Sequence, residues 1–387
     1  MRTTIRSLLL LGALLAGACR SDSTVQVGPG GSRFRAEAER EERFDLDLEA
    51  GERLLLRGDQ AWIRVESTRD GPGHVVARLT AAGRTDEEAK AVLARYRIEF
   101  ASNDDGADVR VVGEPFEVPG KRGEKLIPRV EFTAFVPPAT ALDARTGLGD
   151  IEASGDLGAT DLHTDFGSVI TSGIRGPLRA NSGSGSVEAV DVEGASIALS
   201  SQFGGVYLAR GRAERISARS GSGAVVAEDL VAASIELTTG FGSIRAAGIA
   251  GALELSTGSG DLRLEGFEGD LTAKSQFGGV DVEGVFASLR TESGSGSVRV
   301  RALPGSRVDS AWSITSNFGA VRVGVPPDFG ADLEASTGFG QVRCELPLVT
   351  EASDETEGAL RGRLGPGGGP LAISSGSGNV SIEALRP

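Results

Sequence analysis

Cysteine, histidine and aromatic residues are scarce in this sequence. It contains two cysteines and two histidines among 387 residues, and aromatic residues make up 5%. Neither His74 nor His163 has the spacing to cysteines or carboxylates that a metal site needs. No Gly-x-Ser-x-Gly motif has a strand, a helix and a histidine around it. No helix follows the many Gly-x-Gly strings to bind a phosphate. We therefore expect no catalytic residues, no metal and no cofactor.

Basic residues are outnumbered by acidic ones, 40 against 54, so the formal net charge is −14. This balance argues against nucleic acid and against anionic lipid surfaces as general partners. Glycine, by contrast, is abundant at 56 residues. Many glycines with few large side chains indicate numerous tight turns around a thin hydrophobic core.

The N-terminus has the features of an export signal. Arg2 and Arg6 precede an apolar run over 8–15, and small residues at 16–18 precede Cys19. The run is too short to span a bilayer, so we expect a signal peptide over 1–18. The motif resembles the lipobox of bacterial lipoproteins, although its leucine lies four residues before the cysteine instead of three. The resemblance implies lipidation of Cys19, and Arg20 after it favours the outer membrane in a diderm. The polar, glycine-rich residues that follow predict a lipidated tether over 19–33. The alternative is an ordinary secretory peptide with an incidental cysteine.

Residues 34–140 alternate between apolar and polar side chains, as half-buried strands do. The pattern is clear in 44–48, 62–65 and 75–79. Thr85 followed by Glu88 is a capping-box start. One helical face then carries Ala89, Val92, Leu93 and Tyr96. We predict a small β-rich segment with one helix that covers a sheet.

Residues 141–387 are a repeat. A glycine, one variable residue and an aliphatic residue recur at intervals of 18 or 19 up to Gly296, and then of 23, 21 and 38. These marker glycines are Gly149, Gly167, Gly185, Gly204, Gly223, Gly242, Gly260, Gly278, Gly296, Gly319, Gly340 and Gly378. Aliphatic residues at fixed offsets argue against flexible linkers. One such unit cannot bury its apolar face alone, so successive units must stack.

We therefore predict an all-β protein whose body is a right-handed parallel β-helix of about 12 turns. A left-handed β-helix needs an aliphatic residue every six positions, which the offsets here do not provide. A calcium β-roll needs an aspartate in each nonapeptide, and only Asp150 and Asp261 stand in the variable position. Cys344 lies two residues after Val342 and is predicted to be a small buried hydrophobe.

The residue before the marker glycine alternates between phenylalanine and serine from Phe166 to Phe318, and the alternation breaks at Phe339. We expect each ring to pack in a corner over the small residues of neighbouring turns.

These repeats resemble the bacterial family of β-helical envelope proteins known as "putative adhesins". The resemblance rests on the Thr-Gly-x-Gly-Asp-Ile and Ser-Gly-Ser-Gly-Ser-Val repeats, the entry strand over 130–137, the helix-strand over 86–100 and the glycine-rich loop over 361–370. It covers roughly residues 35–385. It implies a β-helix and suggests adhesion, and it carries no established catalytic residues.

The outward position between the first two aliphatics of each repeat should form a column with one side chain per turn. Five arginines occupy it within six turns: Arg245, Arg263, Arg299, Arg322 and Arg343. The next column holds Glu228, Glu265 and Glu283, so one interpretation is a solvated ladder of ion pairs. The other is a stripe that binds an anionic glycan or a phosphate through the planar guanidinium groups.

The function expected from these patterns is a lipid-anchored structural or adhesive module of the cell envelope, without catalysis. Its partners would be the membrane through the N-terminal lipid and an anionic glycan or envelope protein, but no nucleic acid. Two alternatives stay open: an envelope-sensing partner of a membrane signalling protein, and a β-helix enzyme that processes polysaccharides. Surface and periplasmic orientations are both compatible with the sequence.

Overall fold

The structure is a computed structural model that describes residues 24–28, 36–69, 71–119, 123–349 and 358–385. It is all-β, with 67% of residues in strands and one helix, and it forms a β-solenoid of about 10 turns. The predicted fold class is confirmed, although we expected about 12 turns. The chain divides into two compact units, residues 1–185 and 186–387. The predicted leader and Cys19 lie outside the described residues. The tether prediction is wrong for residues 24–28, because they form a strand (Thr24–Gly28) that pairs antiparallel with residues 37–41.

The first unit contains strands β1 to β15 and the helix. The strands are β1 (Thr24–Gly28), β2 (Ala36–Leu46), β3 (Arg53–Gly58), β4 (Ala61–Ser67), β5 (Gly73–Gly83), β6 (Tyr96–Asn103), β7 (Gly106–Gly113), β8 (Phe116–Glu117), β9 (Lys125–Leu126), β10 (Arg129–Val136), β11 (Ala141–Leu148), β12 (Ile151–Ser154), β13 (Thr160–Phe166), β14 (Val169–Ser172) and β15 (Leu178–Ser182). Strands β2, β5 and β10 pair antiparallel, whereas β3 and β4 pair parallel with β11 and β12. The parallel coil therefore already includes β3 and β4, inside the segment predicted as a separate β-rich region.

Helix α1 (Asp86–Leu93) packs on β2 and β5 and begins as predicted. The hydroxyl of N-cap Thr85 accepts a hydrogen bond from the backbone N–H of Glu88 at 3.2 Å, which satisfies one of the free donors of the first turn. Ala89, Val92 and Leu93 are buried against the sheet. Tyr96 does not belong to the helical face, because it is the first residue of β6.

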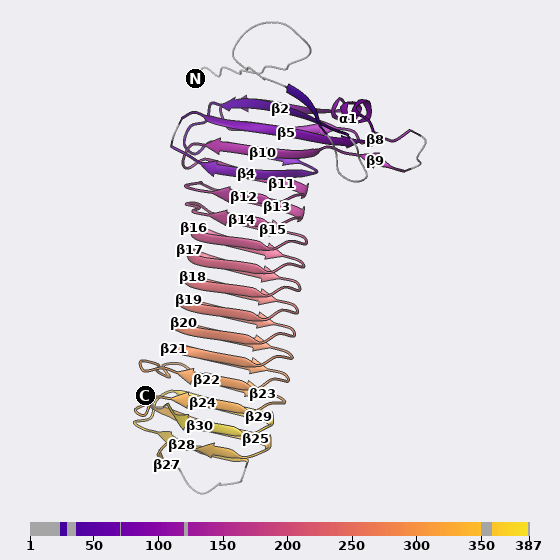
Figure 1. Ribbon diagram of the computed structural model, residues 1–387. Helices are drawn as coiled ribbons and strands as arrows, with labels where there is room; N and C mark the ends of the chain where they lie inside the picture. Colours follow the sequence, from indigo (N-terminus) through magenta and orange to yellow (C-terminus); the bar gives the residue numbers. More distant parts are fainter. Residues whose placement is uncertain (1–23, 29–35, 70, 120–122, 350–357, 386–387) are drawn as a thin grey trace. The chain divides into compact units, whose positions relative to one another are not determined.

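The second unit is a stack of long strands followed by shorter ones. They are β16 (Val187–Ser201), β17 (Val206–Ser220), β18 (Val225–Thr239), β19 (Ile244–Thr257), β20 (Leu262–Ser275), β21 (Val280–Ser293), β22 (Val298–Ala302), β23 (Trp312–Ser316), β24 (Val321–Val325), β25 (Ala331–Phe339), β26 (Val342–Cys344), β27 (Leu348–Val349), β28 (Ala359–Leu364), β29 (Pro370–Ser377) and β30 (Val380–Ala384). Figure 1 shows β16 to β21 lying one above the next, each paired in parallel register with its neighbour.

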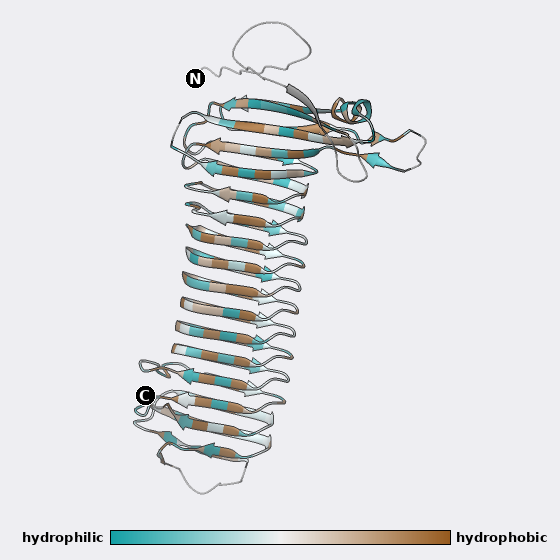
Figure 2. Ribbon diagram, in the orientation of Figure 1, coloured by the Kyte–Doolittle hydropathy of each residue, from teal (hydrophilic) through white to brown (hydrophobic). Residues whose placement is uncertain are grey.

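The core of the second unit consists of stacked aliphatic rows. Val187, Val206, Val225, Ile244 and Leu262 occupy equivalent positions and are at most 1% exposed. Polar residues alternate with them and face solvent, which Figure 2 shows as alternating colours along each strand. An aromatic cluster closes the C-terminal part, where Trp312 packs against Phe286 and Phe329 with ring centroids 6.0 and 5.4 Å away.

The marker glycines stack directly on one another. A Cβ atom on Gly278 would lie 2.0 Å from the carbonyl oxygen of Gly260, so no larger residue fits without moving the backbone. A serine or threonine three residues before the marker glycine holds the stack together. The buried hydroxyl of Ser275 accepts a hydrogen bond from the N–H of Gly278 at 2.8 Å and donates to the carbonyl of Gly260 at 3.1 Å.

The order of the last turns in space differs from their order in the sequence. Strand β29 pairs with both β23 and β25, and β30 pairs with both β24 and β26. The final turn of the chain is therefore inserted between two earlier ones. The turn made by β25 and β26 is covered by β28, which pairs antiparallel with β25.

The predicted corner packing of the phenylalanine rings is wrong. The rings before the marker glycines are 62–81% exposed: Phe166, Phe203, Phe241, Phe277, Phe318 and Phe339. They lie in turns or, for Phe166 and Phe339, at the last residue of a strand, where the inward-outward alternation breaks off, so the periodicity alone could not place them inside.

Candidate functional site

A row of arginines lies on one face of the second unit. Strands β19, β20, β22 and β24 each contribute one, because the residues on both sides point inward. Ile244 and Ala246, which flank Arg245, are 0% and 5% exposed. The parallel register places Arg245 beside Arg263 and Arg299 beside Arg322. Asp281 of β21 lies between the two pairs, next to Arg263 on one side and Arg299 on the other.

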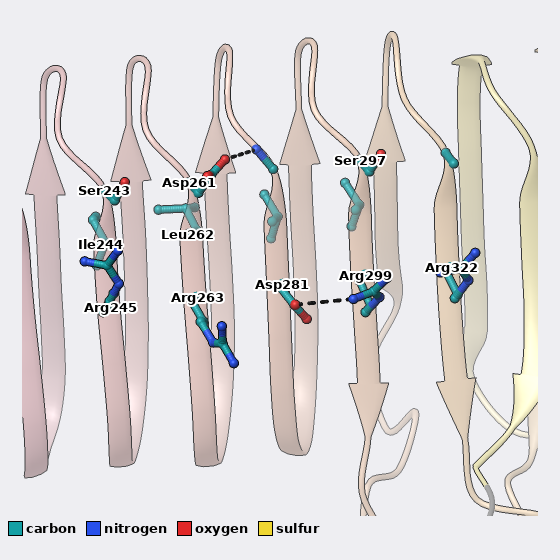
Figure 3. A pocket seen from close by; sticks show the side chains of 14 residues that line it. Ser243, Ile244, Arg245, Asp261, Leu262, Arg263, Asp281, Ser297, Arg299 and Arg322 are labelled. Carbon is teal, nitrogen blue, oxygen red and sulfur yellow. Dashed lines mark hydrogen bonds and ion pairs between the residues drawn. The ribbon is translucent and has the colours of Figure 1, made fainter.

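These residues line a shallow groove of about 440 Å³. We call it the arginine groove and define it by Arg245, Arg263, Asp281, Arg299 and Arg322, together with the first residues of the strands that carry them. Figure 3 shows the five side chains on the same face of successive strands. Asp261 and two small residues, Ser243 and Ser297, form the rim next to the turns.

Two of the four groove arginines have acidic partners. The guanidinium of Arg263 donates to the carboxylate of Glu265 at 2.7 Å, and this hydrogen bond and the negative charge of Glu265 raise the pKa of Arg263. Arg299 forms an ion pair with Asp281 at 3.7 Å. Among the residues that the structure describes, Arg245 and Arg322 have no ion pair and no side-chain hydrogen bond. The groove therefore holds exposed positive charge on an acidic protein.

The structure does not bring the fifth predicted arginine to the groove. Ser381 of the inserted strand β30 lies beside Arg322 on one side and beside Arg343 on the other. Arg343 is thus two strands from Arg322, where the sequence order predicted direct neighbours. The prediction was wrong because the order of repeats in the sequence is not the order of turns in space.

The second outward column does not form a ladder with the arginines. Of its three glutamates only Glu265 pairs with a groove arginine. Glu283 forms an ion pair with Arg301, and Glu228 accepts a hydrogen bond from the hydroxyl of Tyr207 at 3.0 Å. The interpretation as a complete ion-pair ladder is therefore wrong for Arg245 and Arg322, which stay available for a ligand.

Asp261 has a structural role at the rim. Its carboxylate accepts a hydrogen bond from the backbone N–H of Gly279 in the next turn at 2.8 Å. Asn379 occupies the equivalent position of the final turn and accepts from the N–H of Gln341 at 3.0 Å. Because an uncharged amide makes the same contact, the position needs a hydrogen-bond acceptor and not an acid.

The other candidate chemical groups are dispersed. The ring of His74 is tilted by 31° against that of Phe135, with the ring centroids 5.0 Å apart. Nε2 of His163 lies 3.2 Å from the carboxylate of Asp165. Cys344 is half-buried instead of fully buried, and burial raises the pKa of its thiol. Within the described ranges no group of three histidine, cysteine or acidic residues could hold a metal ion. In the same ranges no helix has the length and apolar character needed to cross a membrane.

The solved structures that resemble the chain are distant. A putative adhesin from Bacteroides fragilis is 11% identical, with 89% of this chain and 97% of that chain covered and a TM-score of 0.29. A putative cell adhesion protein from Clostridium sporogenes is 10% identical, with 90% and 100% covered and a TM-score of 0.18. A putative lipid binding protein from Parabacteroides distasonis is 9% identical, with 90% and 97% covered and a TM-score of 0.24. The comparison with curated proteins finds no match.

Because these TM-scores are low, the assignment rests on the family model. The model of the Toastrack DUF4097 family matches residues 127–266 and 205–383, which together span well over half of the chain. These matches include both the entry strand β10 and the strands that carry the arginine groove. The predicted resemblance is confirmed, and the chain belongs to the Toastrack DUF4097 family.

Proposed function

We propose that this protein is a lipid-anchored binding module of the cell envelope and that its arginine groove binds an anionic glycan without cleaving it. The observation that carries the proposal is the row of four arginines along one groove, two of which have no acidic partner in the part of the chain that the structure describes. Guanidinium groups bind carboxylate, sulfate or phosphate through two parallel hydrogen bonds.

The spacing of the row suits an extended ligand. Neighbouring strands lie about 4.8 Å apart, so the four steps from Arg245 to Arg322 span about 19 Å. A single small anion would contact one arginine pair, whereas a linear polyanion contacts both pairs. Asp281 does not block the ligand, because an exposed ion pair contributes at most about 1 kcal/mol and Arg299 can exchange it for a ligand oxygen.

The acidic residues of the groove support binding over catalysis. A glycosidase needs two carboxyl groups that face each other across the scissile bond, free to donate and accept protons. Here the carboxylate of Asp261 accepts a hydrogen bond from the N–H of Gly279, so among the residues that line the groove Asp281 has no second free carboxyl group to act with. We therefore assign no catalytic role to the groove.

The binding claim is tested by isothermal titration of the full chain with a sulfated oligosaccharide derived from heparin. We expect the double variant Arg245→Gln/Arg322→Gln to bind at least tenfold more weakly than the wild type. The matched control is Arg290→Gln/Arg307→Gln, which removes the same charge from two exposed arginines outside the groove. The control should bind like the wild type.

Two results would contradict the proposal. One is an equal loss of affinity in the groove variant and the control, which would show a general charge effect. The other is no binding by the wild type to sulfated, carboxylated or phosphorylated glycans.

Anchoring and orientation need separate tests, since Cys19 lies outside the described residues. A Cys19→Ser variant should leave the membrane fraction of expressing cells if the cysteine carries the lipid, and it should stay there if it does not. Protease treatment of intact cells, followed with an antibody against residues 186–349, then decides the orientation. Digestion supports adhesion at the surface. Protection until lysis supports the alternative, an envelope-sensing partner of a membrane signalling protein.

A further inference from the structure

Five phenylalanine rings of the second unit form an exposed ladder. Phe203, Phe241, Phe277, Phe318 and Phe339 are 66%, 73%, 67%, 69% and 81% exposed. Each ring belongs to the residue directly before a marker glycine, in a turn or, for Phe339, at the end of β25. Exposed aromatic rings in a continuous row are uncommon on monomeric proteins and mark interaction surfaces.

The ladder alternates with serines in space. Ser222, Ser259 and Ser295 occupy the intervening turns, and all are exposed. In the sequence the alternation breaks, because Phe339 follows Phe318. In the structure it is restored, since β29 lies between β23 and β25 and places Ser377 beside Phe339. The order in space is Phe203, Ser222, Phe241, Ser259, Phe277, Ser295, Phe318, Ser377 and Phe339. The alternation is thus a property of the folded surface and not of the repeat.

The turns that carry the ladder are almost free of charge. They consist of residues 202–205, 221–224, 240–243, 258–261, 276–279, 294–297, 317–320, 338–341 and 376–379. Asp261 is their single charged residue, although 24% of the whole chain is charged. The carboxylate of Asp261 accepts a hydrogen bond from the backbone N–H of Gly279. An uncharged row of rings and small residues can be desolvated at little electrostatic cost.

We propose that this ladder is the interface of an antiparallel homodimer, in which the rings of one copy insert at the serine turns of the other. The rings recur at every second strand, which is about 9.6 Å along the stack. The serine turns between them form gaps with the same period. A second copy of the chain carries rings and gaps with the same period, because its surface is identical. A two-fold axis between the turns of Ser259 and Phe277 places Phe277 against the partner's Ser259 and Phe241 against the partner's Ser295.

The available area is sufficient for a specific dimer. A phenylalanine side chain buries roughly 150–250 Å², so the exposed parts of the four rings from Phe203 to Phe318 provide about 550 Å² per copy. The serine turns that they cover add a comparable area. Over both copies the total reaches about 2,200 Å², which is enough for the roughly 1,200–2,000 Å² that stable interfaces bury. The contact is isologous, since each ladder provides both rings and gaps.

Sedimentation velocity of the full chain tests the proposal. We expect the wild type to sediment as a dimer and the variant Phe241→Ser/Phe277→Ser to dissociate with a constant at least a hundredfold higher. Serine already occupies this position in the alternate turns, so the variant retains the fold. The control is Val231→Ser, which removes an exposed apolar side chain outside the ladder and should leave the dimer intact.

The reverse substitution separates ring-into-gap docking from general adhesiveness. Ser259→Phe/Ser295→Phe adds apolar surface and fills two gaps. The proposed dimer should dissociate in this variant, whereas a merely adhesive surface would associate more strongly. The register is tested in a Cys344→Ser background, where Ser259→Cys should form a disulfide across the two-fold axis. Ser222→Cys lies about five strand steps from its symmetry mate and should not.

Three outcomes would overturn the proposal. They are a wild type that sediments as a monomer at all concentrations, a dimer that persists in the Phe241→Ser/Phe277→Ser variant, and tighter association of the Ser259→Phe/Ser295→Phe variant. If the wild type is monomeric and the rings instead confer binding to phosphatidylcholine vesicles, the ladder faces a lipid surface and not a second copy. None of these results bears on glycan binding by the arginine groove.

Discussion

Two adjacent glycines allow a sharp test of how the turns stack. Gly278 is a marker glycine, and Gly279 follows it in the same turn. A Cβ atom on Gly278 would lie 2.0 Å from the carbonyl oxygen of Gly260, a backbone atom that cannot move without its strand. A Cβ atom on Gly279 would meet its nearest neighbours, the carbonyl of Ser297 and the carboxylate of Asp261, at 3.4 and 3.5 Å. We expect Gly278→Ala to destabilise the protein and Gly279→Ala to be tolerated.

The magnitudes follow from these distances. An ordinary contact needs more than 3 Å, so Gly278→Ala must separate two turns by over 1 Å along the stack. Forcing extra atoms into a packed region costs typically about 1–3 kcal/mol, and the rigidity of the backbone contact places this variant at about 3 kcal/mol. Gly279→Ala introduces no overlap and restricts the unfolded chain, which stabilises by about 0.4–1 kcal/mol.

Urea unfolding followed by circular dichroism measures both effects. The transition midpoint of Gly278→Ala should fall by about 1 M or more, and that of Gly279→Ala should stay the same or rise. Midpoints are the safer comparison, because stacked repeats need not unfold in a single step. Equal shifts in the two variants would refute the argument that close stacking selects glycine at the marker position.

Three further predictions concern the hydroxyl stack, the aromatic cluster and a surface carboxylate. Ser275→Ala should lower the free energy of unfolding by about 1–3 kcal/mol, because it leaves the N–H of Gly278 and the carbonyl of Gly260 without their partner. Ser275→Thr should have little effect, and a large loss in the threonine variant would contradict the hydrogen-bond explanation. Trp312→Ala should cost about 3–5 kcal/mol in urea unfolding. Trp312→Phe should cost less, because the buried indole N–H has no hydrogen-bond partner among the described residues. An equal cost would argue against ring packing as the cause. A hydrogen bond from Arg97, and a second from Arg110, lower the pKa of Glu99 below its usual 4.5. Ionised Glu99 therefore stabilises the fold above the pKa of the unfolded chain, and this contribution is lost as the pH falls through the lowered folded pKa. A carboxyl titration by NMR should place the midpoint below 4.5 in the wild type and nearer 4.5 in Arg97→Gln. Identical midpoints would contradict the assignment.

The sequence predicted the solenoid and most of the arginine row, because both depend on a local period. Aliphatic residues at fixed offsets determine which side chains point inward, and the outward positions follow from strand alternation. This reasoning places Arg245, Arg263, Arg299 and Arg322 in one column, which agrees with the register of the strands that carry them.

The failures concern features that no local period determines. The insertion of β29 and β30 between earlier strands depends on pairings between residues far apart in the chain, and it separates Arg343 from Arg322. Ring exposure at Phe241 depends on the path of a turn, where side chains do not alternate between two faces. The repeat period could not predict that β3 belongs to the coil, because the strand it pairs with, β11, begins more than eighty residues later.

The most direct test of the account combines binding and product analysis in one measurement. The full chain is incubated with a fluorescent sulfated oligosaccharide, and bound ligand is recovered and sized by chromatography. The account predicts that the wild type retains the ligand at its original length and that Arg245→Gln/Arg322→Gln retains little. Recovery of shortened or unsaturated fragments with the wild type, absent with the variant, would contradict it and show that the arginine groove is the site of an enzyme.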